Sequence, residues 1–301
     1  MLKIGIAGCG DWSNTVLKEI NNNKNFKLQS VFCRNYDSKK IKFDNNIKIY
    51  DNIKSFFLEN NNDCIYVVGN PELNYQAVNF AIKNKIPLIL EKPIGSTYEN
   101  VKRIKLLAIK YNLIIFPNLT NYFSNSFLYF KNYIDINFNE IKRIIVFEGS
   151  DGPYRKNIHP IWDWGFHSFS TLLKIFDGKK LSKINKKEIK NSNTQINGVI
   201  TRFKFTVESK FEVKLINGNL FKKKLRKYKI ILKNHNVLEV NMINHKMYLN
   251  KNIVFENKKS PLQSLLNIFY DTINDGNNNH SNNLLEISEK TTKILEEFYD
   301  C

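Results

Sequence analysis

Short apolar segments alternate with amphipathic segments over the first third of the chain. Residues 3–7 and 64–68 are almost continuously apolar, which is typical of strands that are buried on both faces of a sheet. The same pattern predicts strands at residues 26–33, 87–90 and 113–116. It also predicts one helix that ends near residue 20 and two more at residues 73–84 and 98–111. This strand–helix alternation indicates an α/β fold with a parallel, doubly wound sheet over residues 1–118.

The pattern changes after residue 118. We expect helices near residues 126–134 and 162–176, a strand at 143–148, and a series of strands with turn signals from residue 181 to 255. Two helices, residues 262–274 and 284–299, close the chain, and the polar segment 274–283 between them reads as a mobile loop. A run of strands with turn signals favours antiparallel pairing. Residues 119–301 are therefore predicted to form an α+β domain with a largely antiparallel, open sheet.

Length and composition agree with two globular domains. The chain has 301 residues, of which 42% are hydrophobic, and one domain typically takes about 100–200 residues. No apolar run approaches the roughly 18 residues that cross a bilayer, so we expect no membrane-spanning segment.

The net charge of +18 suggests nucleic-acid binding at first sight. However, only six of the 46 basic residues are arginines, whereas proteins that read bases and phosphates usually rely on arginine. The lysines are also scattered, apart from one dense run at residues 222–227, which we expect in a hairpin of the second domain. We therefore expect no nucleic-acid partner.

The four cysteines do not show the spacing of a zinc site. So few cysteines in a long chain predict no disulfide framework, and they are consistent with a reducing cytoplasm. They are Cys9, Cys33, Cys64 and Cys301. The stretch that ends in Cys9 resembles a lipoprotein cleavage site, but it lacks a charged segment and a long apolar segment before it, so we expect no export signal.

A glycine-rich loop follows the first predicted strand directly. Gly8 and Gly10 are separated by one residue, and a helical pattern begins immediately after them. Two glycines in this position allow a tight turn and a close approach to a pyrophosphate, which the helix N-terminus attracts. Ser13 stands where a third glycine or an alanine is usual. The loop predicts a dinucleotide site, and an ordinary strand–helix turn remains the alternative.

The end of the second predicted strand indicates which dinucleotide binds. A carboxylate at this position pairs with the ribose of NAD, and a cation accommodates the 2′-phosphate of NADP. The strand ends in Cys33-Arg34, and the first acidic residue, Asp37, comes late. We interpret Arg34 as a ligand of the 2′-phosphate. A surface arginine that stacks on adenine, compatible with either cofactor, is the alternative.

Glu91-Lys92-Pro93 follows the predicted strand at residues 87–90. Ligands of parallel sheets lie beyond the carboxyl ends of the strands, so Lys92 is expected at the cofactor crevice. A solvated surface lysine is the alternative.

Asp163 and His167 are four residues apart in the predicted helix that follows the loop at residues 150–160. This spacing places both side chains on one helix face, and a histidine beside a carboxylate can exchange a proton near neutral pH. A helix-capping Asp163 and a core His167 are the alternatives. His159 could complete a metal-ligand set, but it precedes Pro160 and is biased to extended backbone, so we predict no metal site.

In this order and at these intervals, the motifs resemble signature stretches of the glucose–fructose oxidoreductase and inositol dehydrogenase family (Gfo/Idh/MocA). The stretches are KIGIAGCGDW, NPELNYQAVNFAIKNKIPLILEKPIGSTYENV and WDWGFHSFSTLL, and the resemblance covers nearly the whole chain. It implies an N-terminal Rossmann domain and a C-terminal α/β domain whose open sheet forms the interface of a homodimer or homotetramer. It also implies that the last helix, residues 284–299, packs back on the first domain.

Carried over residue by residue, the resemblance implies that Lys92 is the catalytic lysine, and that Asp163 and His167 are the carboxylate and the proton-transfer histidine. With it we assign the dinucleotide to Gly8, Gly10, Asp11, Trp12, Ser13, Arg34, Asn70, Pro71, Tyr75, Glu91 and Lys92. The substrate is assigned to Lys92, Tyr122, Trp162, Asp163 and His167.

Two positions depart from the family's pattern. Tyr75 stands where many relatives have histidine, and Tyr122-Phe123 stands where many have an arginine followed by an aromatic residue. Both positions border the nicotinamide or the substrate in the family. The family's usual substrate therefore does not carry over to this chain.

Together these observations predict an oxidoreductase that uses NADP, or else NAD, to interconvert a secondary alcohol and a ketone. The expected substrate is a small molecule of the sugar, sugar-nucleotide or cyclitol class, and the expected location is the cytoplasm. The alternative is a catalytically inactive protein that binds a dinucleotide or a sugar and has a regulatory or accessory role.

Overall fold

The computed structural model describes residues 1–34, 46–59, 61–156, 158–190, 198–257 and 259–299. The chain divides into two compact units. The first comprises Met1–Asn118 and Leu262–Lys293, and the second comprises Leu119–Pro261 and Ile294–Cys301. Leu262–Lys293 thus follows the strands of the second unit in sequence and belongs to the first unit.

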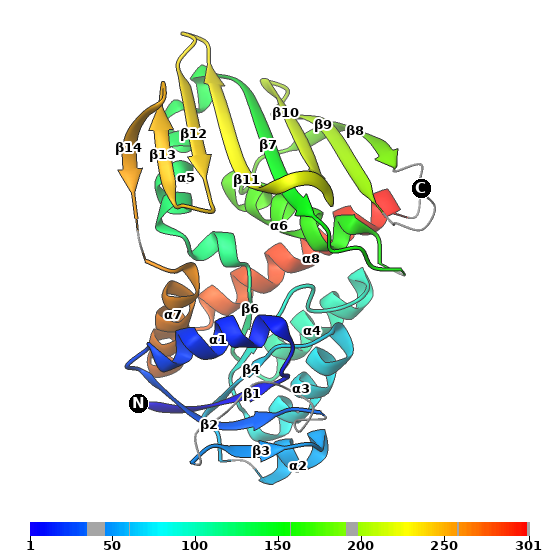
Figure 1. Ribbon diagram of the computed structural model, residues 1–301, viewed down its shortest axis with the longest axis vertical. Helices are drawn as coiled ribbons and strands as arrows, with labels where there is room; N and C mark the ends of the chain where they lie inside the picture. The colour runs from blue at the N-terminus through cyan, green and yellow to red at the C-terminus, as the bar shows by residue number, and fades with distance from the viewer. Residues whose placement is uncertain (35–45, 60, 157, 191–197, 258, 300–301) are drawn as a thin grey trace. The chain divides into compact units, whose positions relative to one another are not determined.

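The first unit is built on a parallel sheet of six strands in the order β3-β2-β1-β4-β5-β6 (Figure 1). The strands are β1 (Leu2–Ala7), β2 (Phe26–Phe32), β3 (Lys48–Tyr50), β4 (Cys64–Val67), β5 (Leu88–Leu90) and β6 (Ile115–Pro117). The strand order reverses direction between β1 and β4. The crevice outside the carboxyl ends of the strands at such a switch point is where ligands of doubly wound sheets bind.

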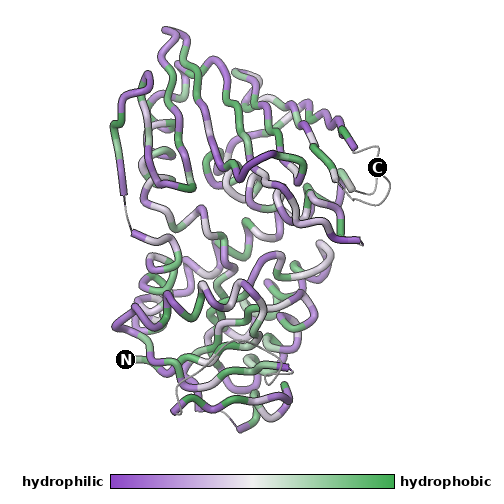
Figure 2. Tube along the Cα trace, viewed as in Figure 1, coloured by the Kyte–Doolittle hydropathy of each residue, from purple (hydrophilic) through white to green (hydrophobic). Residues whose placement is uncertain are grey.

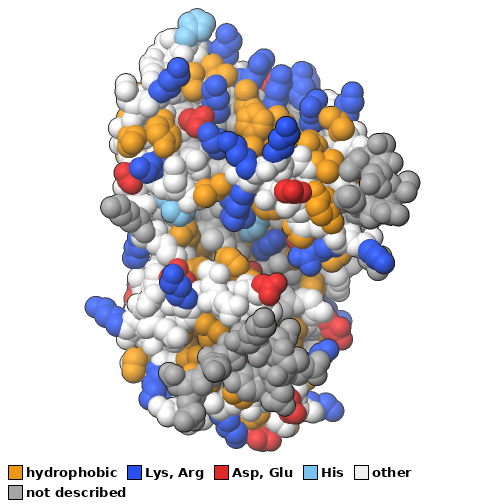
Figure 3. Space-filling model, viewed as in Figure 1, with side chains coloured by type: hydrophobic (Ala, Val, Ile, Leu, Met, Phe, Trp, Pro, Cys, Tyr) orange, Lys and Arg blue, Asp and Glu red, His pale blue; other side chains and the backbone are white. Residues whose placement is uncertain are grey.

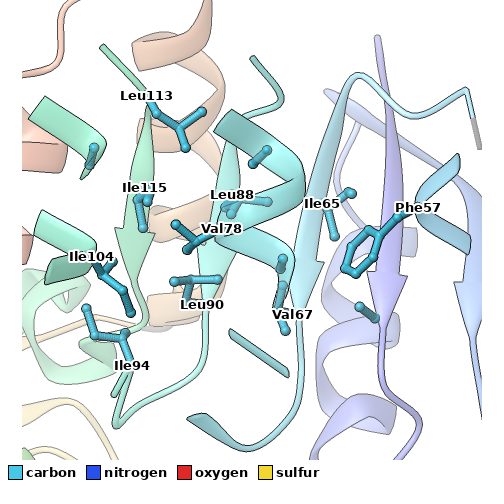
Figure 4. Packing of buried hydrophobic residues seen from close by; sticks show 14 of the residues in the cluster. Phe57, Ile65, Val67, Val78, Leu88, Leu90, Ile94, Ile104, Leu113 and Ile115 are labelled. Carbon is cyan, nitrogen blue, oxygen red and sulfur yellow. The ribbon is translucent and has the colours of Figure 1, made fainter. Parts of the chain in front are cut away.

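Helices cover both faces of this sheet. They are α1 (Asp11–Asn21), α2 (Ile53–Glu59), α3 (Pro71–Asn84), α4 (Tyr98–Lys110), α7 (Pro261–Asp275) and α8 (Asn279–Tyr299). Figure 4 shows the core on one face, where Val78 and Ile104 from the helices lie close to Leu90 of the sheet. On the other face, Phe269 of α7 packs against Phe26 and Phe116.

Two parts of the first unit differ from the prediction. The segment 274–283, predicted to be a mobile loop, is largely helical, because α8 begins at Asn279. Its Ser281 is buried and exchanges hydrogen bonds with the backbone of Ile115 at 2.9 Å. The short elements β3 and α2 were not predicted.

The second unit contains a sheet of eight strands in the order β14-β13-β12-β11-β7-β10-β9-β8. The strands are β7 (Ile141–Asp151), β8 (Leu181–Lys190), β9 (Val199–Val207), β10 (Phe211–Gly218), β11 (Leu220–Leu232), β12 (Val237–Asn241), β13 (Lys246–Leu249) and β14 (Asn252–Glu256). Strands β7 and β10 run parallel, and the other neighbouring pairs are antiparallel. The predicted fold class is confirmed in both units.

Two helices, α5 (Asn125–Asn137) and α6 (Pro160–Ile175), cover one face of this sheet. Phe130 of α5 packs on Tyr228 with ring centroids 5.7 Å apart, and Phe169 of α6 packs on Phe203 at 5.0 Å. Strands β9 and β10 alternate buried apolar residues with polar ones, an alternation visible in Figure 2. The second face is open, as is common for antiparallel sheets.

Lysine and arginine side chains gather on the visible face of the second unit (Figure 3). Many of them have carboxylate partners on the open sheet face. Glu212 pairs with Arg143, Lys204 and Lys214 at 3.3, 2.7 and 3.6 Å. Glu239 pairs with Lys227 at 2.8 Å. This part of the positive charge is therefore balanced locally.

A disulfide bond joins Cys9 to Cys33, which corrects the prediction that the chain contains none. The two cysteines follow the parallel neighbours β1 and β2, in which Ala7 is paired with Phe32. Equivalent ends of adjacent strands lie close together, so their Cα atoms are 5.2 Å apart, within the range that a disulfide can bridge. Cys64 is a buried free thiol, and Cys301 lies outside the described residues.

Within the described residues, no helix is both long and apolar enough to cross a membrane.

Candidate functional site

The glycine loop after β1 has room for a ligand. Gly8 has a φ of +122°, and a Cβ at this position would lie 2.1 Å from the carbonyl oxygen of Val68. A side chain is therefore excluded there both by conformation and by space. A Cβ on Gly10 would meet no atom within 4 Å, so the loop is open on that side.

Gly10 is also the N-cap residue of α1, and no side chain caps this helix end. Unsatisfied N–H groups of a first helical turn attract anions. The loop therefore fits the pyrophosphate of a dinucleotide.

Ser13 is fully buried where a third glycine was expected, and its hydroxyl donates a hydrogen bond to the carbonyl of Gly10 at 2.5 Å. Its Oγ therefore closes the first turn of α1. Asp11 lies in the same turn.

Glu91, directly after β5, accepts hydrogen bonds from three separate parts of the first unit. Its Oε1 accepts from Trp12 Nε1 at 2.7 Å, from Tyr66 Oη at 2.9 Å and from Asn118 Nδ2 at 2.7 Å. Burial raises the pKa of the Glu91 carboxyl, and the three hydrogen bonds act in the opposite direction. Glu91 thus ties the start of α1 to β4 and to the end of β6. Tyr66 and Asn118 were not predicted.

Lys92 follows Glu91 in a turn that α3 holds in place. The buried Asn74 of α3 donates through Nδ2 to the carbonyl of Glu91 at 2.9 Å, and the carbonyls of Pro93 and Ile94 lie 3.4 and 3.5 Å from the same atom. The carbonyls on both sides of Lys92 are therefore fixed by one side chain. This contact places Lys92 at the carboxyl edge of the sheet, at the end of β5, where the sequence predicted it.

Arg34 lies in a turn beyond β2 and is exposed. The residue before it, Cys33, is buried and carries the disulfide to the glycine loop. The bond therefore holds the position after β2 close to that loop. Asp37 lies outside the described residues.

Asn70, Pro71 and Tyr75 lie on α3, at the side of a cavity of about 640 Å³ in the first unit. Asn70 is the N-cap of α3, and its Oδ1 accepts from the backbone N–H of Leu73 at 3.0 Å. The guanidinium of Arg103 lies over the ring of Tyr75 at 5.5 Å. Asn70 and Tyr75 thus have structural partners, and part of each also lines the cavity.

In the second unit, α6 carries both Asp163 and His167, as predicted. Asp163 forms an ion pair with Arg155, whose Nε lies 3.0 Å from Oδ2. Arg155 comes from the loop before the helix and was not predicted. Trp162, also on α6, is half-buried.

The backbone around His167 is held rigidly. His167 is buried, with 9% of its surface exposed. Its carbonyl oxygen accepts from Thr171 Oγ1 at 2.7 Å and from Ser170 Oγ at 3.1 Å. Gly165 allows the helix to pack closely, since a Cβ there would lie 3.2 Å from Leu295 and 3.4 Å from Asn217. Gly165, which lies between Asp163 and His167 in the sequence, thus has a packing role.

His159 is the N-cap of α6. Its Nδ1 accepts from the backbone N–H of Ile161 at 3.2 Å, and its Nε2 lies 3.4 Å from Glu188. Burial lowers the pKa of His159, with Glu188 acting in the opposite direction. No cluster of potential metal ligands occurs among the residues that the structure describes.

Tyr122 lies on η2 (Thr120–Phe123), a 3-10 helix of the second unit. Its ring stacks on Phe127 with centroids 5.9 Å apart, and the ammonium of Lys174 lies over it at 5.3 Å. The neighbouring Asn121 donates to Thr171 Oγ1 of α6 at 3.2 Å. This 3-10 helix is therefore tied to the helix turn that follows His167.

Comparison with known proteins adds to this geometry. Residues 2–119 match the oxidoreductase family with an NAD-binding Rossmann fold, GFO/IDH/MocA. Residues 2–119, which contain β1 to β6, thus carry this family's Rossmann fold. The resemblance predicted from the sequence is thereby confirmed, and the glycine loop lies in a domain that binds NAD(P) in an oxidoreductase. None of the curated proteins matches the chain.

Solved structures of the same fold cover nearly the entire chain. A dehydrogenase from Chromobacterium violaceum has a TM-score of 0.83 at 14% identity, covering 99% of this chain and 94% of its own. UDP-N-acetylglucosamine 3-dehydrogenase GnnA from Acidithiobacillus ferrooxidans has a TM-score of 0.80 at 12% identity, with 98% and 96% covered. The dehydrogenase MviM from Clostridium difficile has a TM-score of 0.80 at 19% identity, with 99% of both chains covered. At these identities the likeness shows the shared fold.

Proposed function

We propose that the protein is a dehydrogenase or reductase that interconverts a secondary alcohol and a ketone on a sugar, a sugar nucleotide or a cyclitol. The observation that carries this proposal is the open glycine loop of the first unit, together with Lys92 between two carbonyls that Asn74 contacts. The second unit adds Asp163 and His167 on α6. A nicotinamide dinucleotide, when bound, supplies or accepts the hydride. A binding protein without turnover would have no need for the three side chains together.

Each residue has a distinct role in this proposal. In the oxidation direction, His167 takes the proton of the substrate hydroxyl through its imidazole. Lys92, as an ammonium ion, donates a hydrogen bond to the same oxygen and stabilises its developing negative charge. Asp163 orients the histidine or binds a neighbouring hydroxyl, while Arg155 fixes one of its carboxylate oxygens.

Gly8, Gly10 and the first turn of α1, which includes Asp11, Trp12 and Ser13, hold the dinucleotide phosphates. Asn70, Pro71, Tyr75 and Glu91 contribute along α3 and at the end of β5, and Tyr122 and Trp162 border the substrate.

Steady-state kinetics on the purified protein test the proposed activity. NAD, NADP and their reduced forms are combined with a panel of sugars, cyclitols and sugar nucleotides, and nicotinamide absorbance is followed. We expect saturable turnover with at least one member of this panel. Tight dinucleotide binding without turnover on any member would favour the regulatory alternative.

NADP is the proposed cofactor, and it is expected to bind more tightly than NAD by about 5–30-fold, or about 1–2 kcal/mol. The reason is that the Arg34 guanidinium can bind the 2′-phosphate through charge-assisted hydrogen bonds, and solvent screens part of this gain. Arg34→Ala should weaken NADP and leave NAD nearly unchanged. Calorimetric titration of both cofactors into both proteins measures this. Equal weakening of the two would assign Arg34 to adenine stacking instead.

The assembly and location follow from the same proposal. The open face of the second unit's sheet would join two or four copies of the chain. Its central positions, Ile145, Phe147, Ile216 and Ile231, are half-buried apolar residues within a charged surround. Light scattering measures the mass of the assembly.

We place the protein in the cytoplasm. Whether Cys9 and Cys33 are oxidised or reduced in the purified protein tests that placement.

A further inference from the structure

The Cys9–Cys33 disulfide lies within the part of the first unit that we assign to the dinucleotide. Cys9 stands between Gly8 and Gly10 in the glycine loop. Cys33 follows β2 and directly precedes Arg34. In doubly wound folds the glycine loop approaches the pyrophosphate, and the end of the second strand approaches the adenosine ribose. The bond therefore links the two places at which the adenosine half of a dinucleotide is held.

The sheet does not need this bond for its register. The backbone N–H of Gly8 donates to the carbonyl of Phe32 at 3.0 Å, and that of Cys33 donates to the carbonyl of Tyr50 at 2.8 Å. The strand ends on both sides of the bond are thus already fixed by backbone hydrogen bonds. The cross-link therefore constrains the loop at Cys9 rather than the sheet.

The two cysteines differ in exposure. Cys33 is fully buried, whereas Cys9 is half-buried and its neighbour Gly10 is exposed. A Cβ on Gly10 would meet no atom within 4 Å, so there is free space beside Cys9. Thiol–disulfide exchange depends on access of the attacking thiolate to a sulfur atom. An external thiolate can therefore approach the bond from the side of Cys9.

Cys64, the free thiol of the described part of the chain, has a different environment. It is fully buried in β4, and burial raises the pKa of its thiol well above the usual value. The thiolate is the form that exchanges, and structural buried cysteines are inert. Cys64 thus provides an unreactive reference in the same sheet.

We propose that Cys9 and Cys33 form a redox modification site, at which a dithiol reductant lowers the affinity of the protein for its dinucleotide. In a reducing compartment, where we place the protein, the disulfides that do form are usually transient and catalytic or redox-sensing. The inference rests on the proposed assignment of the glycine loop to the dinucleotide. It is independent of the substrate and of the proton-transfer step.

The dithiol supplies everything that the exchange consumes. One of its thiolates attacks Sγ of Cys9, which forms a mixed disulfide and releases Cys33 as a thiolate. The second thiolate then attacks the dithiol's own sulfur in the mixed disulfide, which releases Cys9 and leaves the dithiol as a cyclic disulfide. The two electrons and two protons that the dithiol loses end on the two cysteines.

The disulfide form is expected to bind the dinucleotide more tightly. The bond holds the Cα atoms of Cys9 and Cys33 5.2 Å apart. After reduction, the loop at Cys9 and the end of β2 can move independently, and the ligand has to order them. Reduction should therefore weaken dinucleotide binding about 5–30-fold, the range expected for ordering about two side chains on binding.

The test measures dinucleotide affinity in both redox states of the full-length protein, with Cys301→Ser as the background so that no terminal thiol reacts. NAD and NADP are titrated by calorimetry into the oxidised protein, into protein reduced with dithiothreitol, and into protein reoxidised with glutathione disulfide. Thiol titration after desalting should count two new thiols on reduction, and circular dichroism should show an unchanged fold. Cys64→Ser is the matched control that keeps the pair, and Cys9→Ser/Cys33→Ser lacks it.

Cys64→Ser should show the full loss of affinity on reduction and its recovery on reoxidation. Cys9→Ser/Cys33→Ser should bind equally under both conditions. Linkage gives a second readout, because a ligand that favours the oxidised form must stabilise that form by the same factor. In a glutathione buffer, the quotient of squared thiol over disulfide concentration at which half of the pair is reduced should therefore rise about 5–30-fold with saturating dinucleotide.

A Cys9–Cys33 pair that does not interconvert in the folded protein would refute the modification site. Equal or higher affinity after reduction would refute it as well. Absence of dinucleotide binding in both redox states would overturn the loop assignment of the proposed function, and the modification site with it. The two failures are therefore distinguishable.

Discussion

His167→Ala should lower kcat by about 10²–10⁴-fold, the range typical of losing a positioned general acid or base. The affinity for the dinucleotide should stay the same, because the glycine loop that holds it belongs to the first unit. The backbone of α6 should also persist, since Thr171 and Ser170 bond to the carbonyl of residue 167 and not to its side chain. Steady-state kinetics and cofactor titration on the same preparation measure the two effects.

His280→Ala is the matched control, because His280 is an exposed histidine of α8. Its kcat should equal that of wild type. Turnover of His167→Ala within a few-fold of wild type would remove His167 from the proton-transfer step. A parallel loss of cofactor affinity would instead indicate that the substitution disturbs the fold.

Cys33→Ser should lower the free energy of unfolding by about 3 kcal/mol, which is the entropic effect expected for a cross-link that closes a loop of this size. The bond joins residues 24 positions apart in the sequence. Denaturant unfolding of wild type with and without a reductant should show the same difference. The double variant Cys9→Ser/Cys33→Ser should be insensitive to the reductant, and thiol titration of denatured, unreduced wild type counts the free cysteines.

A wild-type protein that unfolds identically with and without reductant, and in which Cys9 and Cys33 react as free thiols, would contradict the disulfide. That outcome would agree with the proposed cytoplasmic location, because disulfides persist mainly in oxidising compartments. The opposite outcome would place the protein in an oxidising environment or make the bond a redox-responsive one. The measurement therefore decides between two predictions for Cys9 and Cys33. The sequence predicts free thiols in a reducing cytoplasm, and the structure predicts a disulfide bond.

The parts of the fold that could be predicted are those in which burial imposes a pattern. β4 is apolar along its length, and β1 has no polar side chain from Ile4 onward, because both sheet faces are covered. The helix α6 was predicted because its apolar residues recur at helical spacing. β3 has three residues and α2 has seven, which is too short for a periodicity to emerge. The return of α7 to the first unit depends on packing against Phe26 and Phe116, and no local signal encodes it.

The candidate site shows the same division. Gly8, Lys92 and His167 could be proposed as site residues from the sequence because each lies in a motif whose chemistry requires a given residue type. Tyr66 and Asn118 were missed because their role depends on which strands are neighbours. The disulfide was missed for a similar reason, although the pairing of β1 with β2 would have placed Cys9 beside Cys33. Considering the strand order together with the residue pattern would have revealed it.

The convergence of three donors on one oxygen of Glu91 has an evolutionary consequence. Trp12, Tyr66 and Asn118 share a single acceptor, so the effect of changing one depends on whether the other two are present. Replacing the Glu91 carboxylate with an apolar side chain would remove the shared acceptor of all three donors at once, and of these contacts only the hydrogen bond from Asn118 to Tyr66 would remain. These four positions are therefore expected to show strong epistasis and to drift as a group, while the exposed lysines of the second unit are free to change one at a time.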